Sequence, residues 1–506
     1  MSAEETTKTR STPRFRVGVL SVVQIILVVI IFFAANFLSS LHHRPFDISD
    51  DLGFTLAPST QRYLASPDVA DREDRIRMIV AFRADSPFYE RIRPVAEEYV
   101  RLSNGKIQLM LLDPIRANDQ AESIAAEYNL IFNQDLVIID ARTSQERKEA
   151  KGQKVSPHVH ISRLEDMVVY ETDANNQRRV RGFLGEDALR TGLVNAIEGK
   201  PRRMWVLADK SDLGTENGSD VWPVLSANLV SQNVLPERVQ LGGKESIPDD
   251  VDAIAIIGAR YDFTAEELKI LEAYWGRPRA SILVTTGEAE VPPRLRSFLR
   301  TQGVTPRNDR VLTSKSGEVR TAVVAHFTSG MELTKDLWEK STMFEGATKS
   351  LEVREGAEDL LNQRIAPFSL LEADPRYWGE SEFPADSVGF DKDHDNMAPL
   401  PLAAAVLKGT ATDERFAADT GRMIVISNTA FLEPNRARQA NLDFLASATN
   451  WLVGRESLVG EAPRNLRLYR IPILPAQITF INRINLLILP IGLFLIGLMV
   501  WAGRRA

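Results

Sequence analysis

Cysteine is absent from all 506 residues of this sequence. No disulfide can form, so any extracytoplasmic domain of the chain folds without one, which a chain of this size permits. The absence also excludes a thiol nucleophile, a CxxC redox pair and a cysteine-ligated zinc site.

Three sequence motifs of common activities are also missing. No G-x-G-x-x-G follows the first expected strand of the second domain described below, and no G-x-x-x-x-G-K-[ST] occurs anywhere. The G-x-S-x-G motif that carries the nucleophile of many hydrolases is absent too. We therefore predict that the protein is not an enzyme and uses no cofactor.

An excess of positive charge is lacking as well. The formal net charge is −7 and the sequence pI is about 5.6. No basic stripe appears along the chain, so a nucleic-acid partner is not expected. The content of 44% apolar and 25% charged residues is typical of globular protein, and the length favours two or three domains.

Two long apolar stretches are present, at residues 17–41 and 484–503, and neither contains a charged residue. A bilayer core roughly 30 Å thick requires about 20 apolar helical residues, so we predict a transmembrane helix at each position. A buried core helix is the alternative for the second stretch. A signal peptide cleaved near Ala34-Ala35-Asn36 is the alternative for the first.

Basic residues flank the outer ends of both stretches. Because positive residues stay cytoplasmic, both termini are expected inside a bacterial inner membrane, with the bulk of the chain in the periplasm. Small residues allow membrane helices to pack closely. The candidate packing residues are Ala34, Ala35, Gly492 and Gly497. Residues 1–16 are then a cytoplasmic tail, and residues 458–483 a linker to the second span.

The first extracytoplasmic domain is expected at residues 45–198. Apolar periodicity alternates between strand and helix, which predicts a βαβ pattern in an α/β domain. An antiparallel pair of strands, residues 158–170 with 178–184, and an amphipathic helix over 185–198 are expected to close it. The expected elements before them are strands at 75–82, 106–112 and 135–140, and helices at 87–102 and 120–128.

The second domain is expected at residues 199–457. Strands and helices alternate again, which predicts a doubly wound α/β fold. Thr264 and Glu267 form a capping box at the start of a helix over 265–275. The pattern weakens over an insertion at about 307–421, within which residues 374–401 resemble a long loop. Residues 422–454 are expected to be the last βα unit.

Three short segments of the second domain directly follow expected strands. They contain Gly258, Gly287 and the pair Ser427-Asn428. Ligands of α/β sheets bind at the carboxyl ends of the strands. These four residues are therefore the candidate ligand-binding edge.

Two other clusters have a chemical and a simpler interpretation. His158 and His160 would point to one face of a strand and could hold a metal, but no third ligand is evident, so we interpret them as surface residues. Residues 391–396, DKDHDN, have the acidic density of a calcium loop. They lack its turn glycine and closing glutamate, so a solvated loop is favoured. No metal site is predicted.

The order and spacing of several segments resemble the GldG-type family, auxiliary components of ABC transport systems named from bacterial gliding motility. The segments include RIRMIVAFRADSPFYERIRPVAEEYVRL at the start of the first domain, GEDALRTGLVNAIEGKPRRMWVL and GRMIVISNTAFLEPNRARQANLDFLASATNWLVGRES. The final span ends in Trp501 and Arg504-Arg505. The similarity covers nearly the full length. The family often has Gly-Asp-Ser where this chain has Ile426-Ser427-Asn428, which weakens the idea of an acidic ligand there.

The resemblance implies a thioredoxin-like first domain without redox cysteines. It implies a glutamine-amidotransferase-like second domain, a fold also found in an intraflagellar-transport subunit. It further implies a non-catalytic subunit that works with a separate ABC permease and ATPase, in the lipid bilayer, and presents its domains to a substrate or to a periplasmic or envelope partner. A membrane-tethered periplasmic hydrolase and a structural envelope-binding anchor are the alternatives.

Overall fold

The structure is a computed structural model, and it describes residues 14–41, 55–149, 156–172, 178–211, 213, 221–315, 318–338, 340–383, 389–409, 420–459, 466–467 and 482–503. By their internal contacts, Met1–Phe54 and Thr55–Ala506 form separate compact units. Residues 1–13 of the predicted tail lie outside the described residues, as do residues 460–465 and 468–481 of the predicted linker.

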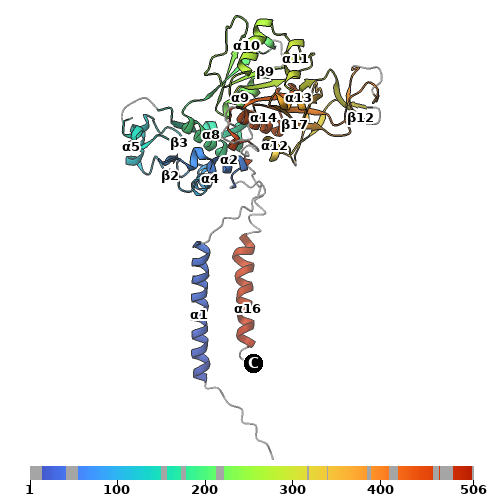
Figure 1. Ribbon diagram of the computed structural model, residues 1–506. Coiled ribbons are helices and arrows are strands. Elements are labelled where there is room, and N and C mark those ends of the chain that lie inside the picture. The colour runs from blue at the N-terminus through green and yellow to red at the C-terminus, as the bar shows by residue number, and fades with distance from the viewer. Residues whose placement is uncertain are drawn as a thin grey trace, which may run out of the picture. The chain divides into compact units, whose positions relative to one another are not determined.

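Helices occupy both predicted spans. Helix α1 (Arg14–Leu41) covers the first, and the π-helical turn η5 (Ile484–Ile488) followed by α16 (Leu489–Gly503) covers the second (Figure 1). The π-helical turn precedes Pro490, which has no N–H to donate to the preceding turn. Among the described residues, no helix is found to be both long enough and apolar enough to cross a membrane. The two membrane crossings therefore stay predictions.

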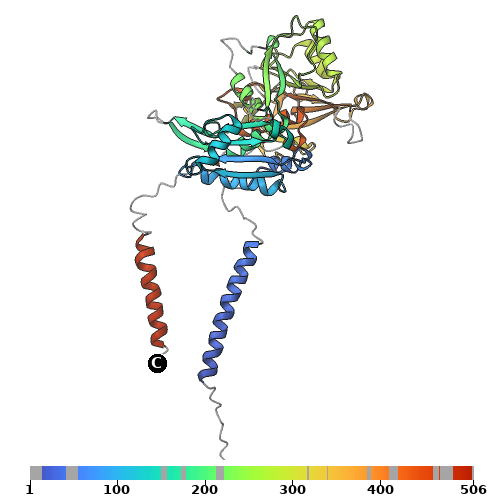
Figure 2. The same cartoon turned by 90° about the vertical axis from the view of Figure 1, so that its left-hand side faces the viewer.

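A four-stranded sheet follows, drawn in blue to teal in Figure 2, with the strand order β2-β1-β3-β4. Strands β1 and β2 are parallel, whereas β3 is antiparallel to both β1 and β4. The predicted βαβ unit is confirmed as β1-α4-β2. The elements are β1 (Ile76–Ala81), α4 (Tyr89–Leu102), β2 (Ile107–Leu112), α5 (Asn118–Tyr128), β3 (Leu136–Asp140) and β4 (Val159–Arg163).

Helix α4 forms where the apolar periodicity predicts it. Its buried residues recur every one to four positions along one face, as a helix packed against a sheet requires. The chain turns back after it through Asn104 and Gly105, both with positive φ. The buried residues are Ile92, Val95, Ala96 and Tyr99.

The predicted pairing of residues 158–170 with 178–184 is wrong in its first half. The helical turn α7 (Leu164–Met167) divides the segment, so that β4 joins β3 and only β5 (Val168–Thr172) pairs with β6 (Arg178–Phe183). Two hydrogen bonds turn the chain there. Asp166 Oδ2 accepts the Arg163 N–H at 3.0 Å, and the Leu164 N–H is donated to the Asp135 carbonyl at 2.9 Å. The apolar residues on either side of Arg163, Glu165 and Asp166 had predicted one continuous strand. The predicted helix over 185–198 is confirmed as α8 (Gly185–Glu198).

The largest sheet has nine strands in the order β15-β14-β17-β19-β20-β10-β9-β7-β8. The five strands from β20 to β8 are parallel, as a doubly wound domain predicts. They are β7 (Arg202–Leu207), β8 (Val234–Val239), β9 (Ala253–Ile257), β10 (Ser281–Thr285) and β20 (Gly421–Ile426). The protein is therefore a mixed α/β protein with a large mixed sheet.

The weakly patterned insertion supplies the other half of this sheet. Its four strands are antiparallel to their neighbours, and β19 joins them to β20. The long loop expected at 374–401 is also interrupted, because β18 (Trp378–Glu380) pairs with β12 (Arg310–Lys315). The four strands are β14 (Val323–Phe327), β15 (Ser341–Phe344), β17 (Ile365–Ala373) and β19 (Pro401–Lys408).

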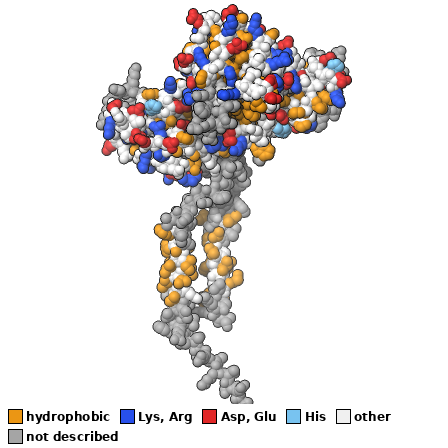
Figure 3. Space-filling view, in the orientation of Figure 1, with side chains coloured by type: hydrophobic (Ala, Val, Ile, Leu, Met, Phe, Trp, Pro, Cys, Tyr) orange, Lys and Arg blue, Asp and Glu red, His pale blue; other side chains and the backbone are white. Residues whose placement is uncertain are grey.

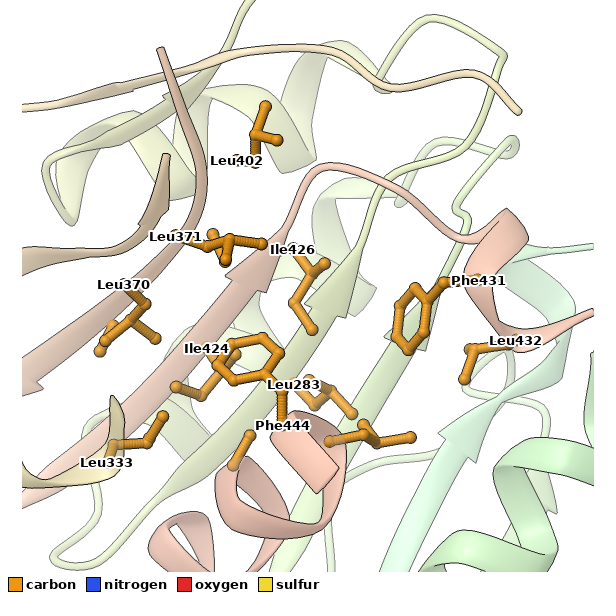
Figure 4. Close-up of a cluster of buried hydrophobic side chains, with 14 of the residues drawn as sticks. Leu283, Leu333, Leu370, Leu371, Leu402, Ile424, Ile426, Phe431, Leu432 and Phe444 are labelled. Atoms are coloured by element: carbon orange, nitrogen blue, oxygen red, sulfur yellow. The ribbon is translucent and has the colours of Figure 1, made fainter. Parts of the chain in front are cut away.

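Helices cover both faces of the parallel part. Helices α9 (Trp222–Ser231) and α14 (Gln439–Leu452) pack into one buried cluster, and α10 (Ala265–Trp275) and α11 (Pro293–Thr301) into another. Figure 4 shows Ile424 and Ile426 of β20 on the face that Phe444 of α14 covers. Alternate residues of β20 thus belong to two different hydrophobic clusters, one on each face of the sheet. The predicted last βα unit is β20 and α14.

Two smaller features are the predicted helix cap of α10 and the distribution of charge on the surface. The capping box of α10 is confirmed, because the Glu267 N–H is donated to Thr264 Oγ1 at 3.2 Å and the Thr264 N–H to Glu267 Oε2 at 2.7 Å. On the face drawn in Figure 3, acidic and basic side chains are interspersed rather than separated.

Candidate ligand-binding edge

The carboxyl ends of β9, β10 and β20 meet at one edge of the nine-stranded sheet. The strands are adjacent and parallel, with Ile257 opposite Thr285 and Thr285 opposite Ile426. The predicted residues therefore come together. A Cβ atom built on Gly287 would lie 3.8 Å from the Cα of Gly258.

Gly258 determines the backbone conformation at this edge. Its φ of +58° lies in the left-handed region, and a Cβ atom there would lie 3.2 Å from Thr429 Oγ1. Its N–H is donated to the carbonyl and to the hydroxyl of Thr285, at 2.9 and 3.1 Å. The hydroxyls of Thr285 and Thr429 are 2.7 Å apart. Glycine thus adopts the left-handed φ without strain and leaves room for the Thr429 side chain.

Ser427 and Asn428 are fully buried, and their polar groups bond within the protein. The N–H and the hydroxyl of Ser427 are donated to the Leu402 carbonyl at 2.8 and 2.9 Å. The Asn428 amide is donated to the Glu345 carbonyl at 2.9 Å and to Thr348 Oγ1 at 2.8 Å. Asn428 Oδ1 accepts the Phe431 N–H at 2.9 Å. Through these hydrogen bonds Ser427 and Asn428 connect the edge to the insertion. Their polar groups do not face a ligand.

Lys349, from the insertion, was not predicted at this edge. Its side chain is 8% exposed, its backbone N–H is donated to the Ser427 carbonyl at 3.2 Å, and Nζ is donated to the Ala289 carbonyl at 2.6 Å. Burial lowers the pKa of Lys349. No sequence signal identifies it, because the insertion lacks a clear pattern.

Arg310 and Thr286 are two further residues that sequence reasoning missed. Arg310, at the start of β12, is half-buried, and its Nη2 is donated to the Gly346 carbonyl at 3.1 Å. Burial lowers the pKa of Arg310. Thr286 is 2% exposed and directly follows β10. Within the described residues, Arg310 Nε and Thr286 Oγ1 are buried without a hydrogen-bond partner.

A buried ion pair lies at the end of β7. Lys210 Nζ is 2.7 Å from Glu267 Oε2 and 3.4 Å from Asp209 Oδ2, and it lies 5.2 Å from the ring centroid of Phe263. Burial acts to raise the pKa of Glu267, but the hydrogen bonds from Lys210 and Thr264 outweigh it and hold this pKa below its ordinary value. The pair fixes α10 to the sheet. Because Lys210 is already paired with carboxylates, its ammonium group is not available to a ligand.

The two histidines of the first domain do point to one face, as predicted. They face α8 and are partly buried, so the interpretation as surface residues is wrong. His158 Nδ1 lies 2.9 Å from the Ala196 carbonyl, and His160 Nδ1 lies 3.2 Å from the Asn195 amide nitrogen. Burial lowers the pKa of His160. The described residues contain no group of three or more His, Asp or Glu side chains arranged to hold a metal.

The acidic loop of residues 391–396 bonds largely to itself. Asp391 accepts the Asp393 N–H at 2.9 Å, and Asp395 accepts the Asp391 N–H at 2.7 Å. Asn396 donates to Asp309 at 2.8 Å. This is the bonding of a surface turn.

The predicted membrane-helix packing residues lie on α1 and on α16. Among the described residues, nothing lies within 4 Å of a Cβ atom built on Gly492 or Gly497. Ala34 is exposed, and the side chain of Ala35 lies outside the described residues. Their role in helix packing stays a prediction.

A pocket of about 910 Å³ opens at the opposite, amino-terminal edge of the sheet. Arginines and carboxylates line it together, and three ion pairs join them within the wall. The pairs are Arg202 with Asp252, Arg277 with Asp249, and Arg422 with Glu456. The pocket therefore has little net charge to attract an ion.

No protein-family model matches the chain, and neither does any curated protein. Solved structures do. The chain is similar to the N-terminal domain of mmIFT52, with a TM-score of 0.34 and 16% identity, over 50% of this chain and 97% of that one. It is similar to a ThuA-like protein from Bacteroides uniformis, with a TM-score of 0.31 and 10% identity, over 50% and 91%.

A third similar structure is the exo-β-1,4-mannosidase Op5Man5 from Opitutaceae bacterium strain TAV5. The TM-score is 0.26 and the identity 11%, over 72% of this chain and 49% of that one. The chain is thus distantly similar in structure to the IFT52 N-terminal domain and to ThuA-like proteins. The TM-scores are too low to say anything of function, and membership of the GldG-type family stays a prediction.

Proposed function

We propose that this chain is a membrane-anchored, non-catalytic auxiliary subunit of an ABC transport complex. Residues 17–41 and 484–503 anchor it in a bacterial inner membrane with both termini in the cytoplasm. The domains between them present binding surfaces to a substrate or to an envelope partner. A separate permease and ATPase carry out transport.

The sequence supports the membrane anchoring and the need for partners. The basic residues outside each apolar stretch agree with cytoplasmic termini. The chain has no nucleotide-binding loop that could couple ATP hydrolysis to transport, so the energy has to come from another chain.

The bonding of Ser427 carries the non-catalytic part of the proposal. This buried hydroxyl lies at the edge where ligands of α/β folds bind, yet it is donated to the Leu402 carbonyl. A serine nucleophile needs a base within hydrogen-bond reach. The ring nitrogens of the four described histidines instead contact Ala196, Asn195, Asp374 and Asp391, and none of these ring contacts is with a hydroxyl. This observation weighs against the hydrolase alternative.

The finer fold assignment belongs to the same proposal. The parallel β1-α4-β2 unit and its antiparallel continuation support a thioredoxin-like first domain. The five parallel strands covered by helices on both faces support a glutamine-amidotransferase-like second domain, enlarged by the insertion. Neither domain has the cysteine on which enzymes of these two folds depend.

The proposal is tested by purifying the tagged full-length protein in mild detergent and identifying its companions by mass spectrometry. We expect an ABC ATPase and a multi-span permease in a constant ratio. An unrelated protein with two membrane spans and the same tag is the control for detergent carry-over.

Recovery of neither partner, with the protein intact and folded, contradicts the transporter assignment. Recovery of envelope components alone supports the structural-anchor alternative. Turnover of a substrate by the purified protein supports the hydrolase alternative.

A further inference from the structure

Lys349 crosses the ends of two parallel strands. Its backbone is bonded to Ser427 after β20, and its ammonium group is bonded to Ala289 in the loop after β10. Those strands are neighbours, so the side chain lies across the edge beside Gly287. The ammonium group has no carboxylate of the described residues within 4 Å, although its side chain is almost completely buried.

Arg310 brings a second cation to the same place. The N–H of the next residue, Val311, is donated to the carbonyl of Thr348 at 2.9 Å, so Arg310 lies on the segment beside Lys349. Burial is the largest cause of the lowered pKa of Lys349; the charges of Glu290 and Asp309 oppose it, and the charge of Arg310 reinforces it. Arg310 makes no ion pair with a described carboxylate. Its register partner Glu380 instead accepts the indole N–H of Trp378 at 3.2 Å. Burying cations without a counter-ion is costly.

The nearest carboxylates are committed elsewhere or exposed. Asp309 accepts the N–H and hydroxyl of Ser350 and the amide of Asn396. Glu290 is exposed and bonds to the amide of Asn308 at 2.5 Å. Glu288 is exposed too, and its charge acts on Arg310 through space. The charges of Glu290 and Asp309 favour the Lys349 ammonium, but neither carboxylate lies within 4 Å of it.

The buried hydroxyl of Thr286 is a second, independent indication of a ligand site at this edge. Its N–H is donated to the Ile426 carbonyl at 2.9 Å, which fixes it between β10 and β20. Its hydroxyl is buried and has no partner among the described residues. Buried hydroxyls are nearly always hydrogen-bonded. Gly287, the next residue, is only partly buried, which leaves access from solvent.

We propose that this edge binds an oxyanion, a phosphate-like group, between the Lys349 ammonium, the Arg310 guanidinium and the Thr286 hydroxyl. Two cations and a neutral donor match the charge and the acceptor oxygens of such a group. The inference deepens the ligand-binding part of the proposed function, because it names the ligand class. It does not depend on a permease or an ATPase.

The test is a titration of the full-length protein in detergent with inorganic phosphate, at constant ionic strength kept with chloride. Thermal unfolding and calorimetry are the readouts. We expect phosphate, and not chloride, to raise Tm. Lys349→Met is expected to weaken phosphate binding at least tenfold. Without phosphate this variant is expected to be at least as stable as the wild type, because a buried cation has been removed.

Lys269→Met, at an exposed position of α10, is the matched control and is expected to bind phosphate like the wild type. If Lys349→Met fails to fold, Thr286→Val, which keeps the side-chain shape and removes the hydroxyl, is expected to weaken phosphate binding. Equal effects of phosphate and chloride on the wild type overturn the proposal. So does an unchanged phosphate affinity in both Lys349→Met and Thr286→Val. If the protein binds phosphate but recovers no transporter partners, the oxyanion site is supported and the transporter assignment is contradicted. The two proposals can therefore fail separately.

Discussion

Arg455 and Glu198 form a two-point ion pair that joins the two halves of the unit that begins at Thr55. Arg455 Nε lies 2.7 Å from Glu198 Oε1, and Nη2 lies 2.5 Å from Oε2. Glu198 is the last residue of α8, and Arg455 follows α14. Arg455 also donates to the Gln232 carbonyl, and Asn450 donates to Gln232 Oε1 at 2.7 Å. One buried polar network thus joins the end of α8 to the end of α14.

This network predicts a strong effect of Arg455→Met. The substitution removes the two-point partner of Glu198, whose side chain is 18% exposed, and leaves this carboxylate only the Asn233 amide at 3.1 Å and Arg202 at 3.9 Å. We expect a loss of about 3 kcal/mol in the free energy of unfolding, since breaking a buried ion pair exposes the cost of the remaining charge. Urea denaturation measures it. Lys335→Met, which breaks an exposed pair with Glu332, is the control and should cost less than about 1 kcal/mol.

Adding Glu198→Gln to Arg455→Met removes the unpaired charge and should restore part of the loss. An Arg455→Met effect as small as that of Lys335→Met would show that the pair does not stabilise the fold.

The two glycines of the candidate edge should respond differently to alanine. Gly258→Ala places a side chain at a φ of +58°, against Thr429, and we expect it to cost about 1–3 kcal/mol in the free energy of unfolding. Gly287→Ala places its Cβ no closer than 3.8 Å to a neighbour and should stay within about 0.5 kcal/mol of the wild type. Thermal or chemical denaturation of both variants tests this. Equal costs would contradict the packing described for Thr429.

Glu186 should make stability depend on pH. Burial raises the pKa of this carboxyl above its ordinary value of 4.5. The folded state therefore holds the proton where the unfolded state releases it. Stability falls as pH rises from 4.5 through the raised folded pKa. Glu186 Oε1 accepts bonds from the Ala57 N–H at 2.8 Å and from Thr60 Oγ1 at 2.7 Å, which an amide oxygen can also accept.

Glu186→Gln should therefore match the wild type at low pH and become relatively more stable as pH increases. Urea midpoints measured at a series of pH values test this, with Glu332→Gln at an exposed position as the control for net charge. A constant deficit of Glu186→Gln at every pH would mean that the ionised carboxylate stabilises the fold.

The absence of cysteine allows a direct test of the proposed topology. A single cysteine introduced as Lys269→Cys, on exposed α10, should react with a membrane-impermeant maleimide in cells whose outer membrane has been permeabilised. Ser11→Cys, in the predicted cytoplasmic tail, should react only after lysis. The cysteine-free parent is the blank. Labelling of Ser11→Cys from outside, or no labelling of Lys269→Cys, would contradict the predicted orientation.

Local patterns predicted many of the elements. The parallel strands β9, β10 and β20 are short apolar runs buried on both faces, and α4 and α10 show helical periodicity with recognisable ends. The alternation of such elements also indicated the parallel half of the large sheet. Where a helical turn that contains Glu165 and Asp166 divides a predicted strand, as α7 does between β4 and β5, the prediction was wrong. The interruption depends on a bond to the distant Asp135.

The sequence by itself determined the absence of thiol chemistry and of a nucleotide loop, the alternation of strands and helices, and the places where strands end. Those properties follow from side-chain types and from spacing within about ten residues. Only the tertiary structure decided that the insertion completes the large sheet and that Ser427 and Asn428 are bonded internally. It alone brought Lys349 across the ends of β10 and β20. Their positions depend on pairings between segments tens of residues apart, and the free energy of those pairings is not recorded in any local pattern.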